Sequence, residues 1–457
     1  MSIRSTGGAL PADQLSGTHA DARRFLRRLT AATTGGEFID GYVLGGIGSA
    51  LPFVVADLHV STVWQGLIGA SALIGIFVGG PIFGWLTDRF GRRLMFTVDM
   101  VLFLVGSILQ LFVGNAWELF AVRLLMGLAI GAEYAIGAPL LSEYAPAKIR
   151  GKLLASLEVT WYIGYILGFG VGAAFVGAGP GSWRWILGSA TIPAIICLIL
   201  RNGTPESVRW LLSRGRRGEA EGLVTRYHLD IDLDEAAAEV TPGKPGFGAL
   251  FSKGHRRATI FTSVFWSALV LPYFAIFTFS PEVLSALGIS SDVAGSLVND
   301  GIAVLGVLVG TLVVDRIGRR KLLIPPFWIT AVAMLVIGIW PHGPVVLVVL
   351  CFMVFSFFNA ASSALTAVYP MEVFPTAIRT TGVGFSAAMS RVGAAIGTFL
   401  LPLALNHIGI GPTMLIAAAV LAIGGAVSQL LGPETNGLTL TQSVRSSVTG
   451  DTAPTSS

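Results

Sequence analysis

The sequence predicts an all-α polytopic membrane protein with twelve transmembrane helices, in two six-helix pseudo-symmetric halves around a central cavity. Three observations predict this class. Of the 457 residues, 53% are hydrophobic and only 12% are charged, which is far from the composition of soluble domains. Apolar stretches of about 20 residues, long enough to cross a bilayer, recur along the chain. Charged motifs repeat at a nearly constant offset.

The expected spans are the apolar runs between charged or Gly/Pro-containing breaks. They cover residues 29–56, 63–87, 94–113, 116–140, 153–177, 183–201, 256–280, 294–313, 321–340, 344–368, 380–405 and 411–431. The predicted domains are therefore an N-terminal tail (1–28), an N-terminal half (29–201), a central loop (202–255), a C-terminal half (256–431) and a C-terminal tail (432–457).

The central loop is rich in Arg, Glu, Asp and Gly and contains no run long enough to cross the membrane. Within it, apolar residues such as Val208 and Leu211 stand among charged ones, a pattern that predicts short amphipathic helices lying on the membrane-facing surface. Tails rich in Ser, Thr, Gly and Ala, at residues 1–20 and 442–457, are typical of disordered segments.

The basic residues predict the orientation. If the N-terminus is cytoplasmic, 27 of the 30 Lys and Arg lie on the cytoplasmic side, Arg184 lies outside, and Arg123 and Arg391 lie within spans. The positive-inside rule then places both termini in the cytoplasm. Because these charges are scattered over short loops, a nucleic-acid partner is not expected. Compact loops and an Ala- and Gly-rich composition favour a bacterial inner membrane.

An internal repeat divides the chain into two halves. The motif Asp-Arg-x-Gly-Arg-Arg occurs at residues 88–93 and again at 315–320. Glu-x-x-Pro-x-x-x-Arg occurs at 143–150 and at 372–379, and Pro-Glu occurs at 205–206 and at 433–434. Three motifs that repeat at almost one period indicate a duplication. Two similar halves that face each other across a cavity form the general plan of a transporter.

These motifs, together with Pro205-Glu206-Ser207-x-Arg209, resemble the signature set of the major facilitator superfamily in its sugar-porter-like branch, over about Arg27 to Leu440. Within that branch the chain is closest in motifs to the aromatic-acid/metabolite:proton symporters. The resemblance implies alternating access with a cytoplasmic gate, whose ion pairs lock the inner side of the two halves in the outward-open state. The expected gate residues are Gly84, Asp88, Arg89, Gly91, Arg92, Arg93, Glu133, Glu143, Arg150, Glu206, Arg209, Asp315, Arg316, Gly318, Arg319, Arg320, Glu372, Arg379 and Glu434.

Ionisable residues inside the spans are costly to bury and usually have a task. Glu37 and Asp40 are three residues apart, so they share one face of the first span. Counted from the span ends, Asp40 and Arg123 lie at similar depths on antiparallel spans, and we expect them to pair. Matching positions of the resembling families carry coupling residues. Asp40, Glu37 and Arg123 are therefore the expected proton-coupling residues.

A guanidinium in mid-membrane is suited to holding a carboxylate by two parallel hydrogen bonds, and Arg391 occupies such a position. A Glu at position 158, where sugar porters place a sugar-binding Gln, argues against hexose transport. Asp300 is open to three interpretations: a cation ligand, a substrate ligand or a cap at a local break. The full set of expected substrate-binding residues is Arg391, Glu158, Trp161, Tyr165, Trp266, Asn359 and Asp300.

The leading prediction is proton symport of a small organic, possibly aromatic, carboxylate. A proton-linked sugar or polyol symporter is the alternative, and a non-transporting membrane sensor is a remote one, because the tails and loop are too short for a signalling domain. No Walker lysine motif and no His/Cys cluster occur, and Cys197 and Cys351 stand alone in apolar runs. We therefore expect no enzyme activity, no metal and no cofactor, with the proton gradient as energy source. The expected partners are substrate, protons and the lipid bilayer, and the expected state is monomeric.

Overall fold

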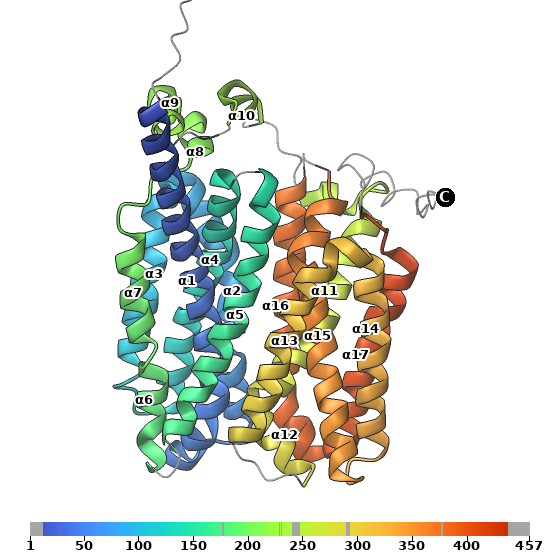
Figure 1. The fold of residues 1–457 in the computed structure, drawn as a ribbon. Helices are drawn as coiled ribbons and strands as arrows, with labels where there is room; N and C mark the ends of the chain where they lie inside the picture. Colours follow the sequence, from blue (N-terminus) through green and yellow to red (C-terminus); the bar gives the residue numbers. More distant parts are fainter. Residues whose placement is uncertain are drawn as a thin grey trace, which may run out of the picture.

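The computed structural model of the chain describes residues 12–145, 147–175, 178–227, 229, 231–239, 247–288, 293–375 and 378–436, with side chains from residue 22. Within these residues every regular element is a helix. The helices run roughly parallel to one axis in two bundles (Figure 1). The expected all-α class is confirmed, whereas the expected tail at 442–457 lies outside the described residues.

The N-terminal bundle forms the left side of Figure 1. Its elements are α1 (Ala12–Leu58), α2 (Thr62–Phe90), α3 (Arg92–Leu109), α4 (Ala116–Tyr144), α5 (Ala147–Val171), the 3-10 turns η1 (Gly172–Phe175) and η2 (Pro180–Ser182), α6 (Trp183–Gly188) and α7 (Thr191–Arg201).

The C-terminal bundle forms the right side of Figure 1. It is preceded by α8 (Val208–Ser213), α9 (Arg217–Tyr227), α10 (Leu233–Glu239) and η3 (Phe247–Phe251). Its helices are α11 (Arg256–Thr278), α12 (Ser280–Ala286), α13 (Val293–Ile317), α14 (Arg319–Ile339), α15 (Val345–Val373), α16 (Arg379–His407) and α17 (Ile410–Leu431).

Eleven helical segments of the described chain are long and apolar enough to cross a membrane. The helix α3 is not among them because its eighteen residues carry three charges, Arg92, Arg93 and Asp99. It nevertheless packs lengthwise against α4 and α7, as a spanning helix does. With α3 counted, the described segments correspond to the twelve expected spans.

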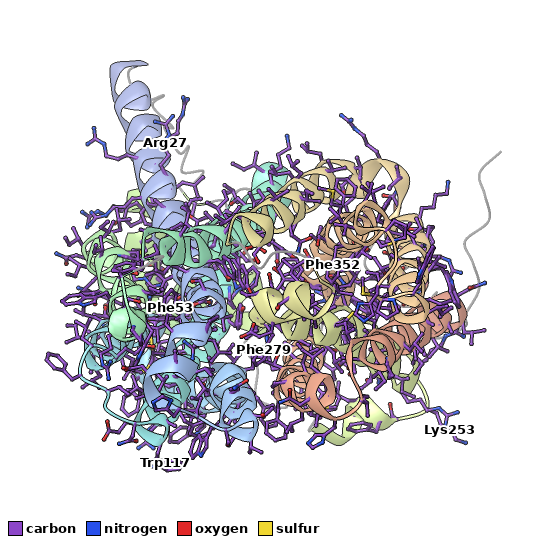
Figure 2. The ribbon with its side chains drawn as sticks, turned by 90° about the horizontal axis from the view of Figure 1, so that it is seen from below. Arg27, Phe53, Trp117, Lys253, Phe279 and Phe352 are labelled. Carbon is purple, nitrogen blue, oxygen red and sulfur yellow. The ribbon has the colours of Figure 1, made fainter. Side chains whose placement is uncertain are left out.

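Several boundaries differ from the expected ones. The helix α1 begins at Ala12, not near residue 29, so residues 12–28 are helical where a tail was expected. Figure 2 shows Arg27 on a part of α1 that projects beyond the bundle, whereas Phe53 lies within it. The sixth expected span is divided into α6 and α7 at Ser189. The seventh ends at Thr278, and α12 begins at Ser280 with Pro281 in its first turn.

Glycines determine how closely the helices approach. A Cβ atom at Gly41 or Gly45 of α1 would meet the backbone oxygens of Trp161 or Tyr165 on α5. The C-terminal half repeats this kind of contact, since a Cβ at Gly306 of α13 would meet the backbone oxygen of Phe357 on α15. Small residues permit such close helix crossings in membranes. They bring the functional side chains of α1 and α5 next to each other.

The short helices expected in the central loop are present, but their apolar residues pack against the N-terminal half. Val208 and Leu211 of α8 are buried in a cluster with the inner ends of α1, α3 and α4. Tyr227 of α9 stacks on Phe25 of α1, with ring centroids 3.9 Å apart. The apolar face of these helices therefore covers one end of the N-terminal half.

Candidate functional site: a charged cavity between the two halves

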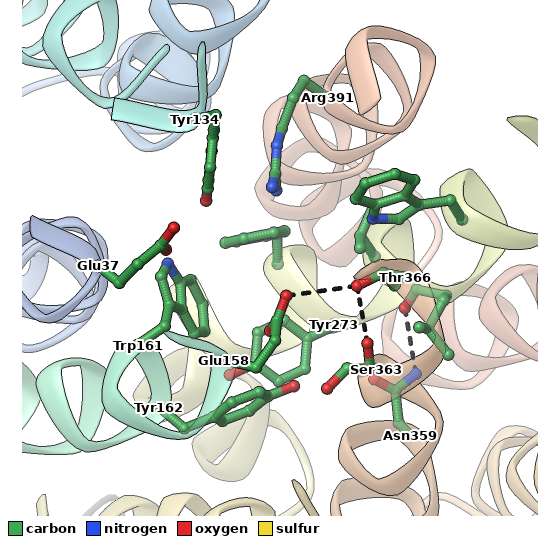
Figure 3. A pocket seen from close by; sticks show the side chains of 14 residues that line it. Glu37, Tyr134, Glu158, Trp161, Tyr162, Tyr273, Asn359, Ser363, Thr366 and Arg391 are labelled. Carbon is green, nitrogen blue, oxygen red and sulfur yellow. Dashed lines mark hydrogen bonds between the residues drawn. The ribbon is translucent and has the colours of Figure 1, made fainter. Parts of the chain in front are cut away.

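A cavity lies between the two halves, with about 460 Å³ of unfilled space that includes its opening to solvent. Both halves contribute to its wall, through α1, α4 and α5 on one side and α11, α15 and α16 on the other (Figure 3). It is lined by Glu37, Tyr134, Glu158, Trp161, Tyr162, Trp266, Leu269, Val270, Tyr273, Phe274, Asn359, Ser363, Thr366 and Arg391. Six residues expected at the site from the sequence line this one cavity: Glu37, Glu158, Trp161, Trp266, Asn359 and Arg391.

Arg391 is the single cation among the residues that line this cavity. Its guanidinium carbon lies 5.0 Å from the ring centroid of Tyr134 and 5.7 Å from that of Phe274, so two aromatic faces hold it in place. Only 8% of the residue is exposed. Among the described residues Arg391 forms no ion pair, which leaves its fork of donors available to a ligand.

Two carboxylates face this cation. Glu37 and Glu158 point into the cavity from α1 and α5 (Figure 3), and Glu37 lies within electrostatic range of both Glu158 and Arg391. The hydroxyl of Thr366 donates to Glu158 Oε1 over 3.4 Å, which joins α5 to α15. The cavity therefore holds two acidic groups and one basic group between largely apolar walls.

An aromatic cluster joins the halves next to the cavity. It consists of Trp161, Tyr162 and Tyr165 of α5 and Tyr273, Phe274 and Phe277 of α11. The ring centroids of Tyr273 and Phe277 are 4.2 Å apart, and the ring of Tyr165 lies 6.1 Å from that of Tyr273. Further out, the amide of Asn406 donates to the hydroxyl of Thr62 over 2.8 Å, which links α16 to α2. These contacts join the two halves through α5 and α11 and through α16 and α2.

Tyr165 and Asp300 do not line the cavity, although the sequence predicted both as substrate ligands. Tyr165 is 1% exposed and forms part of the aromatic cluster. Asp300 on α13 is 4% exposed, and its Oδ2 atom has no hydrogen-bond partner. It lies within electrostatic range of Tyr165 and Tyr273, whose hydroxyls also lack partners. Asp300 therefore lies next to the aromatic cluster and outside the lining of the cavity.

Asp40 is completely buried, and neither carboxylate oxygen has a hydrogen-bond partner. It lies three residues beyond Glu37 along α1, and the two carboxylates are close enough to interact, as expected. The same carboxylate is within range of a buried cluster formed by Arg201, Asp99 and Glu133.

This cluster, which the sequence analysis missed, lies inside the N-terminal half. The guanidinium of Arg201 contacts Asp99 Oδ1 at 2.7 Å and Glu133 Oε2 at 2.6 Å, and all three side chains are at most 1% exposed. Glu133 was expected to reach the gate arginines. It pairs with Arg201 instead, because the side chain faces the interior between α1, α3 and α7 and not the cytoplasmic helix ends.

The expected ion pair between Asp40 and Arg123 is not formed. None of the three guanidinium nitrogens of Arg123 has a hydrogen-bond partner, and Arg123 forms no ion pair with a described carboxylate. It borders a second, smaller cavity, lined by Tyr42 and Val43 of α1 but not by Asp40. Similar depth along two helices does not place two side chains on facing sides, because each residue turns by about 100° around a helix.

The predicted gate motif of the N-terminal half forms a compact network at the ends of α2, α3 and α4. Arg92 pairs with Glu143 at 2.6 Å, and the hydroxyl of Ser207 donates to the same carboxylate over 2.6 Å. Glu206 accepts from the backbone N–H of Arg92 at 2.8 Å, next to Gly91, whose φ of 96° suits glycine alone.

The C-terminal half repeats this network. Arg319 pairs with Glu372 at 2.8 Å, and Thr435 donates to Glu372 over 2.5 Å. Glu434 accepts from the backbone N–H of Arg319 at 3.0 Å, and Gly318 has a φ of 86°. The repeated motifs of the sequence are thus two copies of one three-dimensional arrangement.

Both networks remain within their own half. The sequence analysis expected gate ion pairs that lock the cytoplasmic side of the halves in the outward-open state. The described gate pairs join helix ends of one half only, and the lock stays a prediction. Asp88 and Arg89, also predicted gate residues, accept hydrogen bonds from the Arg214 side chain through their backbone oxygens. At Gly84, a Cβ atom would have no neighbouring atom within 4 Å.

Other predicted gate residues take different places. Arg93 and Arg316 are exposed, and Arg319 also contacts Asp315 at 3.1 Å. Arg320 donates to the backbone oxygen of Gln429 over 3.1 Å, and Arg379 to that of Phe374 over 3.1 Å. The side chain of Arg150 lies outside the described residues. Arg209 is exposed and interacts with another residue.

Two similar helical halves, built of helices long and apolar enough to cross a membrane, that enclose a charged cavity define a membrane transporter for small molecules. The comparisons agree with this class. Residues 27–445 match the sugar (and other) transporter family, and the chain belongs to that family. It is therefore a transporter and not an enzyme.

Relatives and solved structures cover almost the whole chain. The inner membrane metabolite transport protein YgcS of Escherichia coli is 39% identical over 420 residues, covering 91% of this chain and 93% of that protein. The niacin transporter NiaP of Acinetobacter baylyi is 28% identical, covering 89% and 93%. The fold matches that of the proton:xylose symporter XylE of Escherichia coli with a TM-score of 0.77, at 23% identity, covering 92% and 98%.

Proposed function

We propose that this transporter is a symporter that carries a small organic carboxylate together with a proton. The observation that carries this proposal is the unpaired guanidinium of Arg391, held between two aromatic rings and facing the cavity. A carboxylate ligand would form two parallel hydrogen bonds with such a guanidinium. The apolar and aromatic walls around it suit a ring or a short hydrocarbon chain.

The two cavity carboxylates supply a reason for proton coupling. A carboxylate substrate would bring a third negative charge next to Glu37 and Glu158, with only Arg391 to balance them. Binding of a proton at the same time removes this excess charge, so anion and proton favour each other's binding. Asp40, which lies beside Glu37 and has no partner, would take part in the transfer. In this proposal Asp99, Glu133 and Arg201 surround Asp40 as a fixed electrostatic environment.

Two relatives agree with parts of this proposal. Niacin, which gives one of the relatives its name, is an aromatic carboxylate. The fold neighbour XylE is a proton:xylose symporter. We further propose that the chain resides in a bacterial inner membrane as a monomer, with both termini in the cytoplasm. The inner-membrane name of YgcS and the distribution of 27 of 30 basic residues support this placement.

A sugar or polyol is the second candidate substrate, because one side of the cavity is polar. Glu158, Ser363 and Thr366 line that side, together with Asn359, whose amide donates to the backbone oxygen of Leu269 over 3.1 Å. Such groups would bind hydroxyls. In that case Arg391 would position Tyr134 and would not contact the substrate.

A pH measurement on vesicles separates the candidates. The purified protein is reconstituted in weakly buffered vesicles, and benzoates, pyridine carboxylates, short aliphatic acids, hexoses and polyols are added in turn. Alkalinisation outside upon addition of an acid supports proton–carboxylate symport. Alkalinisation with sugars or polyols alone would replace the substrate class, and uptake of a labelled acid without any pH change would remove the proton from the mechanism.

A further inference from the structure

A second cavity lies entirely within the N-terminal half, around Arg123. It encloses about 180 Å³ of unfilled space between α1, the end of α3, α4 and α6. Arg123 is fully buried, and its Nε, Nη1 and Nη2 atoms have no hydrogen-bond partner. A protonated guanidinium offers five donors, and the described structure satisfies none of them.

The groups around this guanidinium do not compensate its charge. The hydroxyl of Tyr42 is engaged with Ser189, 2.8 Å away, and the amide of Gln110 donates to the backbone oxygen of Leu187 over 3.4 Å. The remaining wall is apolar and includes Val43, Ile186 and Ala190. No carboxylate lines the cavity.

A buried cation without a counter-charge is strongly unfavourable, and native proteins pair such charges. The cavity contains one cation, so a monovalent anion balances it, whereas sulfate or phosphate would leave an excess negative charge in an apolar surrounding. The space is much smaller than that of the central cavity, which favours a compact ion over an aromatic acid.

We propose that the Arg123 cavity binds a small monovalent inorganic anion of the size of chloride or bromide, at a site separate from the transport cavity. The ion accepts hydrogen bonds from the free N–H groups of Arg123. All lining residues belong to the N-terminal half, so the site does not depend on contacts between the halves.

Anion binding to the purified full-length protein tests this proposal without any transport substrate. Bromide is titrated at constant ionic strength against sulfate, and its NMR line broadening and the thermal unfolding midpoint are followed. We expect one saturable site per chain and an unfolding midpoint that rises with bromide. Arg123→Gln should weaken binding by at least about tenfold, since it removes a charge-assisted hydrogen bond.

Two further variants keep the test decisive. Ala190→Leu fills the cavity while Arg123 stays in place, so it should also abolish saturable binding even if Arg123→Gln does not fold. Arg391→Gln removes the cation of the central cavity and should leave bromide binding unchanged. Absence of a saturable site in the unmodified protein, or binding that is lost in Arg391→Gln but retained in the two cavity variants, would overturn the proposal.

Discussion

The guanidinium of Arg201 and the carboxylate of Glu133 are 2.6 Å apart in the interior of the N-terminal half, and each side chain is at most 1% exposed. Asp99 completes the cluster at 2.7 Å from the same guanidinium. The guanidinium carbon of Arg201 lies 3.6 Å from the ring centroid of Phe96. Arg201 thus ties α7 to α3 and α4 next to the proposed proton acceptor Asp40.

Removing one partner from this cluster should destabilise the protein severely. Glu133→Gln leaves Arg201 with a single carboxylate partner, and breaking a buried ion pair typically costs about 3–5 kcal/mol. The unfolding midpoint in detergent should fall accordingly. Glu221→Gln is the control, since its pair with Arg217 is about half exposed and should contribute nothing measurable. An equal change in both variants would contradict this account.

The neutral variant Asp40→Asn should separate proton coupling from substrate binding. The amide keeps the size of the side chain but cannot carry a proton between the two sides. We therefore expect loss of uptake against a gradient, while exchange of labelled for unlabelled substrate continues. Both activities are measured in the same vesicles, with Glu118→Gln at the outer end of α4 as a control. Full accumulation by Asp40→Asn would exclude this residue from the coupling step.

The repeated gate networks should contribute equally to turnover. Glu143→Gln and Glu372→Gln each remove the carboxylate that pairs with Arg92 or Arg319. Because a charge-assisted hydrogen bond contributes roughly 1.5–3 kcal/mol, we expect the maximal rate to fall by about tenfold in each variant. The substrate KM should change little, since neither residue lines the cavity. A raised KM at an unchanged rate would place these residues in the binding site.

The close crossing of α1 and α5 can be tested with two glycines five residues apart. A Cβ at Gly41 would collide with the backbone oxygen of Trp161, whereas a Cβ at Gly46 would find its nearest atom, the backbone oxygen of Gly168, 3.7 Å away. Gly41→Ala should therefore cost about 1–3 kcal/mol of stability, as overpacking does. Gly46→Ala should have almost no effect on the unfolding midpoint. Equal midpoints would show that the two helices separate freely at Gly41.

The sequence was sufficient to predict the features that follow from hydrophobic periodicity and from the internal repeat. The repeat put Arg92 and Glu143 in one half and Arg319 and Glu372 at the matching places of the other, and the structure holds one ion pair at each place. The rarity of charge within apolar spans pointed to Arg391, which lines the central cavity. These predictions needed only the order of residues along each helix.

The rotation of each helix about its axis could not be predicted in the same way. Asp40 and Arg123 were matched by depth, yet only Arg123 borders the second cavity. Arg201 follows an apolar run and precedes Asn202, so it was counted as a loop charge, although it is buried. Asp99 was the missed signal: a carboxylate inside the third span implies a buried cation nearby.

Arg391 offers the sharpest test of the substrate class. Arg391→Gln keeps a polar side chain between Tyr134 and Phe274 but removes the charge and the planar fork of donors. Affinity for carboxylates should therefore fall by at least about tenfold, since a hydrogen bond to a charged group contributes roughly 1.5–3 kcal/mol. Binding of neutral solutes should be retained, which can be measured by competition against a labelled ligand. Glu158→Gln is the matched variant, because it removes a negative charge from the opposite wall and should not weaken carboxylate binding. Unchanged carboxylate affinity in Arg391→Gln, combined with loss of polyol binding in Glu158→Gln, would instead establish the polar wall as the substrate site.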